Sequence, residues 1–190
     1  MKFFSFSGVD DLPISDEDKG ILKQSITPLT FKKNHVVIHQ GEICSQIYFI
    51  HTGLVKLSYL TLDGKEFIKS FIHEDGMFGS LHSQLTGGDS TFSVIALEDL
   101  EVEALPFSKL QVLLQNYPAL QYSAMVFFQQ LALKKEVREY EFLCLSARQR
   151  YEKFCQQRPE LLERIKQADL ALYLGITPIA LSRMKHRHGV

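Results

Sequence analysis

The chain has 190 residues, of which 45% are hydrophobic and 23% charged, and its formal net charge is −1. This composition supports a globular core and excludes an intrinsically disordered chain, and no apolar run approaches the roughly 18 residues of a membrane span. We therefore expect a cytoplasmic protein with no secretory signal and no membrane partner. Its three cysteines, at positions 44, 144 and 155, are expected to be free thiols and not metal ligands.

Charge is divided unevenly along the chain. Residues 1–144 contain 12 Lys/Arg and 18 Asp/Glu, a net charge of −6, whereas residues 145–190 contain 9 and 4, a net charge of +5. A basic C-terminal segment on an acidic body favours a polyanionic partner for that segment alone. Helix faces that only contact solvent would give the same net charge. The sequence motifs therefore have to distinguish a polyanion-binding segment from a solvated one.

The first part of the chain is predicted to form one short helix, capped by Ser15, followed by β-strands. Residues 29–106 contain short runs rich in Val, Ile, Phe and Tyr that are separated by Gly and Asp. The pair Asp63-Gly64 predicts a hairpin with a tight primed turn. Strands at this spacing, with no helices between them, indicate an α+β protein whose β part is an antiparallel, jelly-roll-like double-stranded roll.

Helices are predicted beyond the strands. Ser108 is expected to cap a short helix that ends near Tyr117, and Pro118 to open a long one that runs to about Cys144. This long helix has two apolar faces, one of which packs on the roll. The other face predicts a seam with a second copy of the chain, although a helix buried within one chain is the alternative. The predicted dimer seam consists of Val126, Leu133, Val137 and Tyr140.

The last 46 residues contain the most informative motif. After an amphipathic helix that starts near Ser146, the segment QADLALYLGITPIALSRMKHR has Ala171, Gly175 and Leu181 at the spacing of a helix-turn-helix. The small residue permits a close helix crossing, the glycine takes the left-handed turn, and the leucine anchors the second helix. Such a helix can enter the major groove of duplex DNA. The candidate DNA-binding residues are Thr177, Ile179, Ser182, Arg183, His186 and Arg187.

The order of roll, long helix and helix-turn-helix resembles the Crp/Fnr family of bacterial transcription regulators. The stretch GEICSQIYFIHTGLVKLSYLTLDGKEFIKSFIHEDGMFGS is similar to the family's cyclic-nucleotide-binding-type roll, and LGITPIALSRMK to its DNA-binding end. The resemblance implies a homodimer that binds palindromic duplex DNA, with RNA polymerase as a further candidate partner. It implies three units: a sensor roll over 1–117, a dimerisation helix over 118–144 and a helix-turn-helix domain over 145–190.

The resemblance also identifies a candidate ligand pocket. In the family's cyclic-nucleotide binders this segment reads Phe-Gly-Glu-Leu, then a loop, then Arg-Ser/Ala. Gly79 and Leu81 stand at the Gly and Leu positions, but Ser80 replaces the Glu that binds the ribose. Ser90 replaces the Arg that binds the phosphate, and Thr91 follows it. Because a bidentate Arg–phosphate contact is among the stronger polar interactions, we expect an unidentified effector other than cyclic AMP, or an empty pocket.

Other chemistries have weaker support in the sequence. His82 is a conceivable axial haem ligand, and His35, His39 and Glu42 suggest a cupin-like metal enzyme. The latter lacks the His-x-His pair of cupin enzymes, and no nucleophile elbow or phosphate-binding loop occurs. We therefore predict a protein that is not an enzyme and has no metal and no cofactor.

The DNA-binding end departs from the family pattern. Pro178 and Ile179 replace the usual Arg-Glu pair, and Ile179 can contact a thymine methyl group but cannot read guanine or cytosine by hydrogen bonds. Few residues follow the second helix up to Val190, so the usual β-wing is not expected. A degenerate module that acts by ligand or protein binding without DNA therefore stays an alternative.

Overall fold

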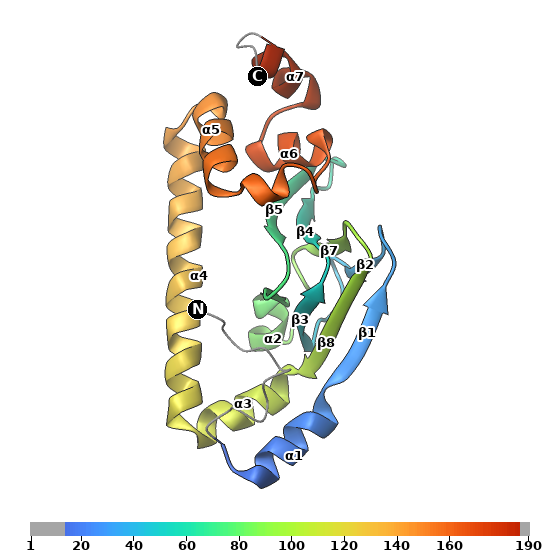
Figure 1. The fold of residues 1–190 in the computed structure, drawn as a ribbon, viewed down its shortest axis with the longest axis vertical. Helices are drawn as coiled ribbons and strands as arrows, with labels where there is room; N and C mark the ends of the chain where they lie inside the picture. The colour runs from blue at the N-terminus through green and yellow to red at the C-terminus, as the bar shows by residue number, and fades with distance from the viewer. Residues whose placement is uncertain (1–13, 187–190) are drawn as a thin grey trace.

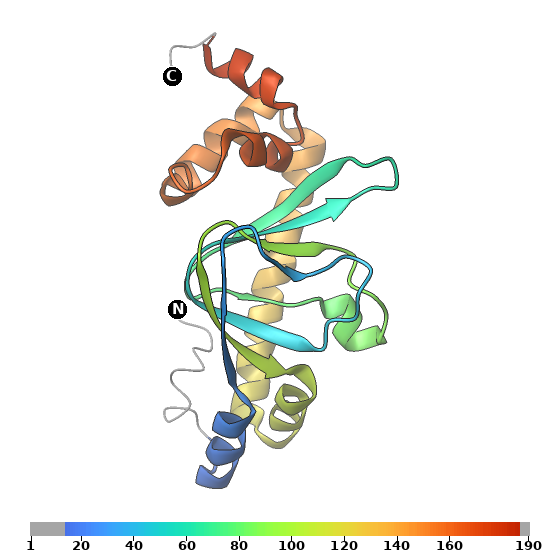
Figure 2. The ribbon, with the colours of Figure 1, turned by 90° about the vertical axis from the view of Figure 1, so that its right-hand side faces the viewer.

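The computed structural model describes residues 14–186, with the side chain of His186 left out. The molecule is elongated: a β-roll lies at its centre, the long helix α4 (Pro118–Cys144) runs along one side, and a small helical unit caps one end (Figure 1). Figure 2 shows that the last helix projects from this end, far from the helices at the other end. No described helix is long and apolar enough to cross a membrane.

The described strands form two four-stranded antiparallel sheets. One sheet has the order β1-β8-β3-β6 and the other β2-β7-β4-β5. The strands are β1 (Thr27–Phe31), β2 (Val36–Ile38), β3 (Gln46–Thr52), β4 (Val55–Leu60), β5 (Glu66–Ile72), β6 (Met77–Phe78), β7 (Ser93–Ala96) and β8 (Leu100–Pro106). Side chains from both sheets, among them Ile50, Val55, Val94 and Val102, form one buried core. The predicted antiparallel roll is confirmed.

The hairpin between β4 and β5 is confirmed, but its predicted turn type is wrong. Both primed turn types need a positive φ at the first central residue, which is Asp63 here, and within residues 14–186 positive φ outside glycine occurs only at Asn34 and Asp75. Gly64 alone takes the left-handed conformation here, with φ +80. Its N–H donates to the Thr61 carbonyl at 2.9 Å, and the Thr61 N–H donates to the Lys65 carbonyl at 2.9 Å. Because the loop is longer than a two-residue turn, Asp63 does not have to adopt the left-handed conformation.

Helices α1 (Asp16–Ser25) and α3 (Phe107–Asn116) close the bottom of the roll in Figure 1. Ser15 caps α1 as predicted, because its side chain accepts a hydrogen bond from the Asp18 N–H. The predicted cap at Ser108 is wrong: α3 begins at Phe107, directly after β8, without a side-chain cap. The Phe107 N–H donates to the Ser45 carbonyl at 2.9 Å, so the neighbouring loop satisfies one of the N–H groups that have no partner within the helix.

Within the described part of the chain, four short helical segments follow α4. They are α5 (Ala147–Gln157), η2 (Pro159–Leu161), α6 (Gln167–Leu174) and α7 (Pro178–His186). Ser146 and Gln149 form a capping box at the start of α5. Between α6 and α7, Gly175 has φ +71, and a Cβ there would approach the Phe142 ring to 2.8 Å. The residue therefore has to be glycine for both conformation and space.

Candidate nucleic-acid interface and ligand site

Helix α7 is built to project its outer side into solvent. The Thr177 hydroxyl accepts a hydrogen bond from the Ala180 N–H at 3.1 Å, so Thr177 caps the start of this helix. Leu181 is buried in the same cluster as Leu174 of α6. Ile179 is 65% exposed, and Ser182 and Arg183 are also exposed. The structure thus brings four of the six candidate DNA-binding residues to one end of the molecule.

The two remaining candidates cannot be placed. The side chain of His186 and the whole of Arg187 lie outside the described residues. Lys185 is half-buried, and its Nζ lies 5.9 Å from the centre of the Tyr151 ring. Among the described basic residues of α7, Arg183 is therefore the one that is exposed.

The helix-turn-helix is packed against the roll and not merely tethered to it. Leu54 and Phe71 of the roll share a buried cluster with Leu170 and Leu174 of α6. Beside this cluster the Lys56 Nζ lies 2.8 Å from Asp169 of α6 and 3.0 Å from Glu66 of β5. Burial alone would lower the pKa of Lys56, but its bonds to both carboxylates raise it. The apolar cluster and the ion pair between Lys56 and Asp169 therefore form one continuous contact between the roll and α6.

Arg164, in the loop before α6, makes a second connection. Its guanidinium binds Glu74 with two contacts of 2.8 and 2.9 Å and Glu98 with two contacts of 2.6 and 2.9 Å. The hydrogen bonds from Arg164 lower the pKa of Glu74 to about 2, despite the opposing effect of burial. Glu74 also accepts a hydrogen bond from the Gly53 N–H at 2.9 Å. This fork, which we call the Arg164 clamp, joins the helical unit to two loops of the roll.

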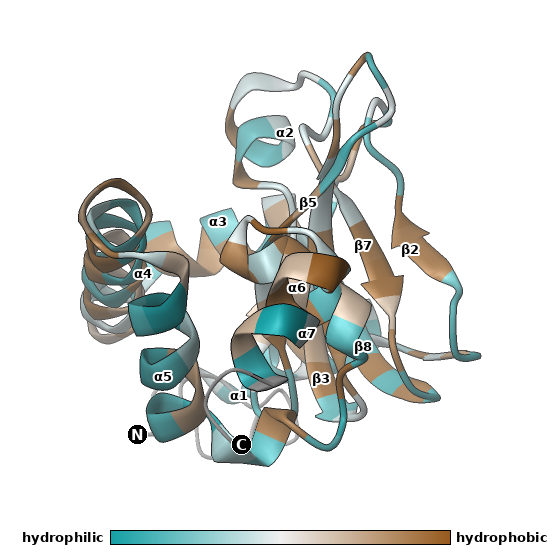
Figure 3. Cartoon of the chain, turned by 90° about the horizontal axis from the view of Figure 1, so that it is seen from above, coloured by the Kyte–Doolittle hydropathy of each residue, from teal (hydrophilic) through white to brown (hydrophobic). Residues whose placement is uncertain are grey.

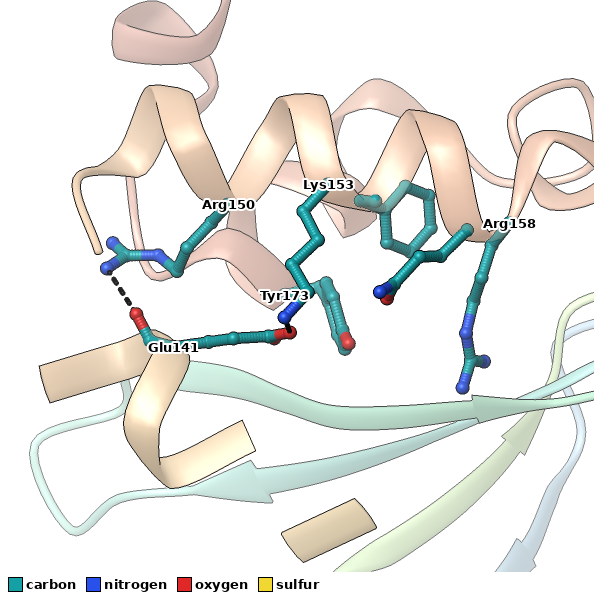
Figure 4. A pocket seen from close by; sticks show the side chains of 7 residues that line it. Glu141, Arg150, Lys153, Arg158 and Tyr173 are labelled. Carbon is teal, nitrogen blue, oxygen red and sulfur yellow. Dashed lines mark hydrogen bonds and ion pairs between the residues drawn. The ribbon is translucent and has the colours of Figure 1, made fainter. Parts of the chain in front are cut away.

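A small polar cavity lies where α4, α5 and α6 meet (Figure 4). It has a volume of about 20 Å³ and is lined by Glu141, Arg150, Lys153, Phe154, Gln157, Arg158 and Tyr173. Arg150 donates to the Leu145 carbonyl at the end of α4 and, at 3.1 Å, to the Leu174 carbonyl at the end of α6. Lys153 pairs with Glu141 at 2.9 Å. These cations bind helix ends and a carboxylate, so the cavity has a structural role.

The predicted ligand-pocket residues hold the backbone of the roll. Ser80 is fully buried, and its hydroxyl caps α2 (Leu81–Thr86) by accepting from the Ser83 N–H at 3.4 Å. Ser90 is also buried and donates to the Phe92 carbonyl at 2.8 Å. A Cβ at Gly79 would lie 2.6 Å from the Gln84 side-chain nitrogen, so the glycine allows close packing. Both hydroxyls therefore have partners within the chain, and a ligand role for them stays a prediction.

The remaining two pocket residues differ in exposure: Leu81 is half-buried and Thr91 exposed. A cavity of about 110 Å³ lies in the same part of the roll. It is lined by Val37, Ile38, His39, Glu42, Ile43, Cys44, Ser45, Gln46 and Tyr48, so none of the five predicted pocket residues contributes to it.

Lys69 lies on β5 of the roll, and the sequence did not predict a role for it. Its Nζ lies 4.0 Å from the centre of the Phe92 ring and 5.7 Å from that of Tyr59. No carboxylate within residues 14–186 forms an ion pair with it. Burial, and secondarily the positive charge of Lys135 on α4, lower the pKa of Lys69 to about 8. A β-bulge explains why the alternation of the strand could not reveal this residue.

The histidines do not form a metal site in the described structure. His35 and His39 flank β2, are exposed, and do not belong to any group of three metal-ligating side chains within residues 14–186. His35 instead stacks on Phe31, with ring centres 4.9 Å apart. His82 is exposed on α2.

The outer side of α4 exposes apolar side chains. Of its 27 residues Leu120 alone is buried, so the alternative of a helix buried within its own chain is wrong. Leu133, Val137 and Tyr140 are exposed, and Val126 is half-buried. Figure 3, which looks along α4, shows hydrophobic segments on the side of the helix turned away from the roll. A second copy of the chain on this side stays a prediction.

Sequence comparisons match this chain to known proteins over about half of its length. Residues 28–117 match the cyclic nucleotide-binding domain family. Over 93 residues the chain is 30% identical to the global nitrogen regulator of a Nostoc species. That alignment covers 48% of this chain and 41% of the relative, so the chain matches less than half the length of this curated protein.

Solved structures extend the likeness to the whole chain. FixK2 from Bradyrhizobium japonicum has a TM-score of 0.75 at 19% identity, covering 87% of this chain and 86% of that one. A transcriptional regulator described as belonging to the Crp/Fnr family, from Eubacterium rectale, has a TM-score of 0.78 at 13% identity, covering 100% and 88%. At these identities the likeness establishes the fold.

Proposed function

The chain carries a cyclic nucleotide-binding domain within a Crp/Fnr-type fold, and from this we propose that it is a transcription regulator. In this proposal residues 1–117 sense a small molecule, residues 118–144 hold two copies together, and residues 145–190 bind duplex DNA. Two of the proteins it resembles are described as regulators, which supports a role without catalysis. RNA polymerase is a further proposed partner.

The exposed side of α7 is the observation that carries the proposal. Its N-cap is formed, its inner side is anchored by Leu181, and Arg183 and Ser182 face solvent at the end of the molecule. A short helix held in this way can enter a major groove, where arginine binds guanine and an exposed apolar residue such as Ile179 can contact a thymine methyl group. The net charge of +5 over residues 145–190 favours approach to the phosphate backbone.

Genomic selection with the purified full chain tests this proposal. DNA fragments retained by the protein at physiological salt should share an inverted repeat, because two recognition helices related by a twofold axis read two half-sites. The half-sites should lie about one helical turn apart, roughly 10 base pairs. Retention without an enriched sequence, lost near physiological salt, would contradict the proposal and favour a module that acts through ligand or protein binding.

Cyclic AMP should not be the effector. The positions that would bind the phosphate and the ribose are Ser90 and Ser80, and both hydroxyls are buried and engaged with the backbone. Titration calorimetry should therefore show no saturable binding of cyclic AMP below ~1 mM. Micromolar affinity would contradict this expectation and require another cation to hold the cyclic phosphate.

Signal transfer from the roll to α7 would use the contacts described above. The Arg164 clamp binds Glu74 and Glu98 of the roll, and Lys56 of β4 binds Asp169 of α6. A ligand that shifts β5 or its neighbours would change both connections, because β5 packs on α6. We propose this packed junction as the route by which the sensor biases the orientation of α7.

A further inference from the structure

Two arginines bind the end of α6 that leads into α7. The last carbonyl groups of a helix have no partner within that helix, and cations are favoured beside them. The guanidinium of Arg138, on α4, donates to the Tyr173 carbonyl, and that of Arg150, on α5, donates to the Leu174 carbonyl at 3.1 Å. The end of α6 is therefore bonded to α4 and α5, which lie outside the helix-turn-helix itself.

Arg138 is held in place by two aromatic rings. Its Cζ lies 3.8 Å from the centre of the Tyr173 ring and 4.3 Å from that of Phe142, which follows it by one turn on α4. Arginine suits such stacking because its guanidinium is planar and weakly hydrated. The Phe142 ring also lies against the turn before α7, since a Cβ at Gly175 would approach it to 2.8 Å. We call Arg138, Phe142 and Tyr173 the Arg138 latch.

The Arg138 latch lies at the opposite end of α6 from the ion pairs with the roll. Lys56 of β4 binds Asp169 in the first turn of α6, and the Arg164 clamp precedes that turn. Apolar packing against the roll has little directionality, whereas bonds at both ends of a helix fix the direction of its axis. Only residues 175–177 separate α6 from α7, so the direction of α6 determines that of α7.

We propose that Arg138 is a positioning residue that sets the angle between α7 and α4, and thereby the spacing of the two half-sites that a dimer reads. This inference rests on the proposed function, in which α4 joins two copies and each α7 enters a major groove. Two recognition helices related by a twofold axis fit half-sites about one helical turn apart. A fixed angle makes the dimer reject other spacings, and a variable angle makes it tolerate them.

Competition binding measures this role with operators whose half-sites are moved together or apart by one or two base pairs. The unmodified chain should lose at least about tenfold in affinity at each altered spacing, because one half-site is then misaligned. Arg138→Met should reduce this loss to less than about threefold, because methionine can neither stack as a cation nor donate to the Tyr173 carbonyl. The base preference within each half-site should stay unchanged, since α7 keeps its own side chains.

Lys134→Met is the matched control, because it makes the same replacement at an exposed position one turn earlier on α4. It should keep the full spacing penalty. Phe142→Leu removes one ring of the Arg138 latch and should also lower the penalty, which decides the matter if Arg138→Met does not fold. The proposal is overturned if Arg138→Met keeps the spacing penalty of the unmodified chain. It is equally overturned if spacing and base preference are lost together, since the residue would then serve folding alone.

A measurement without DNA separates this inference from the proposed function. Spin labels at the exposed Ser182 of α7 and Glu136 of α4 report the distance between the two helices. The labelled chain is diluted with unlabelled copies, and its two cysteines that are not buried are replaced by serine. The distance distribution should be narrow in the chain with Arg138 and in Lys134→Met, and broader in Arg138→Met. An equally narrow distribution in Arg138→Met overturns the inference, whereas broadening without any selected operator contradicts the proposed function alone.

Discussion

Leu133→Glu should sediment as a monomer at concentrations at which the unmodified chain is a dimer. Leu133 is 52% exposed in the single chain, on the side of α4 that also carries Val137 and Tyr140. Burial of each such side chain against a partner contributes roughly 1.5–3 kcal/mol. A carboxylate at the centre of the seam would have to be desolvated without a partner, which opposes association.

The control for this variant is Lys134→Glu, which introduces the same side chain at an exposed position outside the predicted seam. It should leave the dimer intact. A dimer that persists in Leu133→Glu would contradict the predicted seam. If Phe128→Glu then gave monomers, the seam would lie on the neighbouring side of α4, where Met125 and Phe128 are also exposed.

Features that depend on neighbouring residues in the chain were predictable from the sequence. The long helix begins at Pro118 and ends at Cys144 as predicted, because a proline is favoured at the first helical position and no breaker follows. The turn at Gly175 and the cap at Thr177 were predictable for the same reason. In each case the residue type imposes a backbone conformation or a local hydrogen bond.

Features that depend on tertiary contacts were not predictable. Ser108 has the residue type of a cap, but α3 already begins at Phe107, whose N–H donates to the carbonyl of the distant Ser45. Lys69 lies in a strand whose alternation is broken by a bulge, so its aromatic surroundings depend on the register between β4 and β5. Arg164 gave no signal in the sequence, because its partners Glu74 and Glu98 come from loops of another part of the chain.

The candidate ligand pocket shows a limit of reading residues by resemblance. Ser80 and Ser90 were predicted as pocket residues because of the positions at which they stand. The structure gives both hydroxyls local backbone partners, which is a sufficient reason for a small polar residue at each position. A residue that replaces a ligand-binding one can therefore serve the fold alone.

Arg183→Ala should abolish the preference for one base pair in each half-site of the selected inverted repeat. Arg183 follows the buried Leu181 by two positions on α7 and is exposed, so its guanidinium can reach a guanine edge. A bidentate arginine–guanine contact contributes about 1–3 kcal/mol of discrimination. Competition binding with operator variants substituted at single base pairs measures this value, and the unmodified chain should lose affinity at the position where the Arg183→Ala chain does not.

Lys185→Ala is the matched control for base reading. Lys185 lies near Tyr151, and its ammonium is suited to contact a phosphate and not a base. Its removal should weaken binding to all sequences alike and reduce the salt dependence of binding by about one counterion. If Lys185→Ala changed the preferred sequence while Arg183→Ala lowered affinity uniformly, the two roles would be reversed. Arg183 and Lys185 are the two basic residues of α7 whose side chains the structure describes as exposed and half-buried. If neither variant changed DNA binding, α7 would not be the helix that reads DNA.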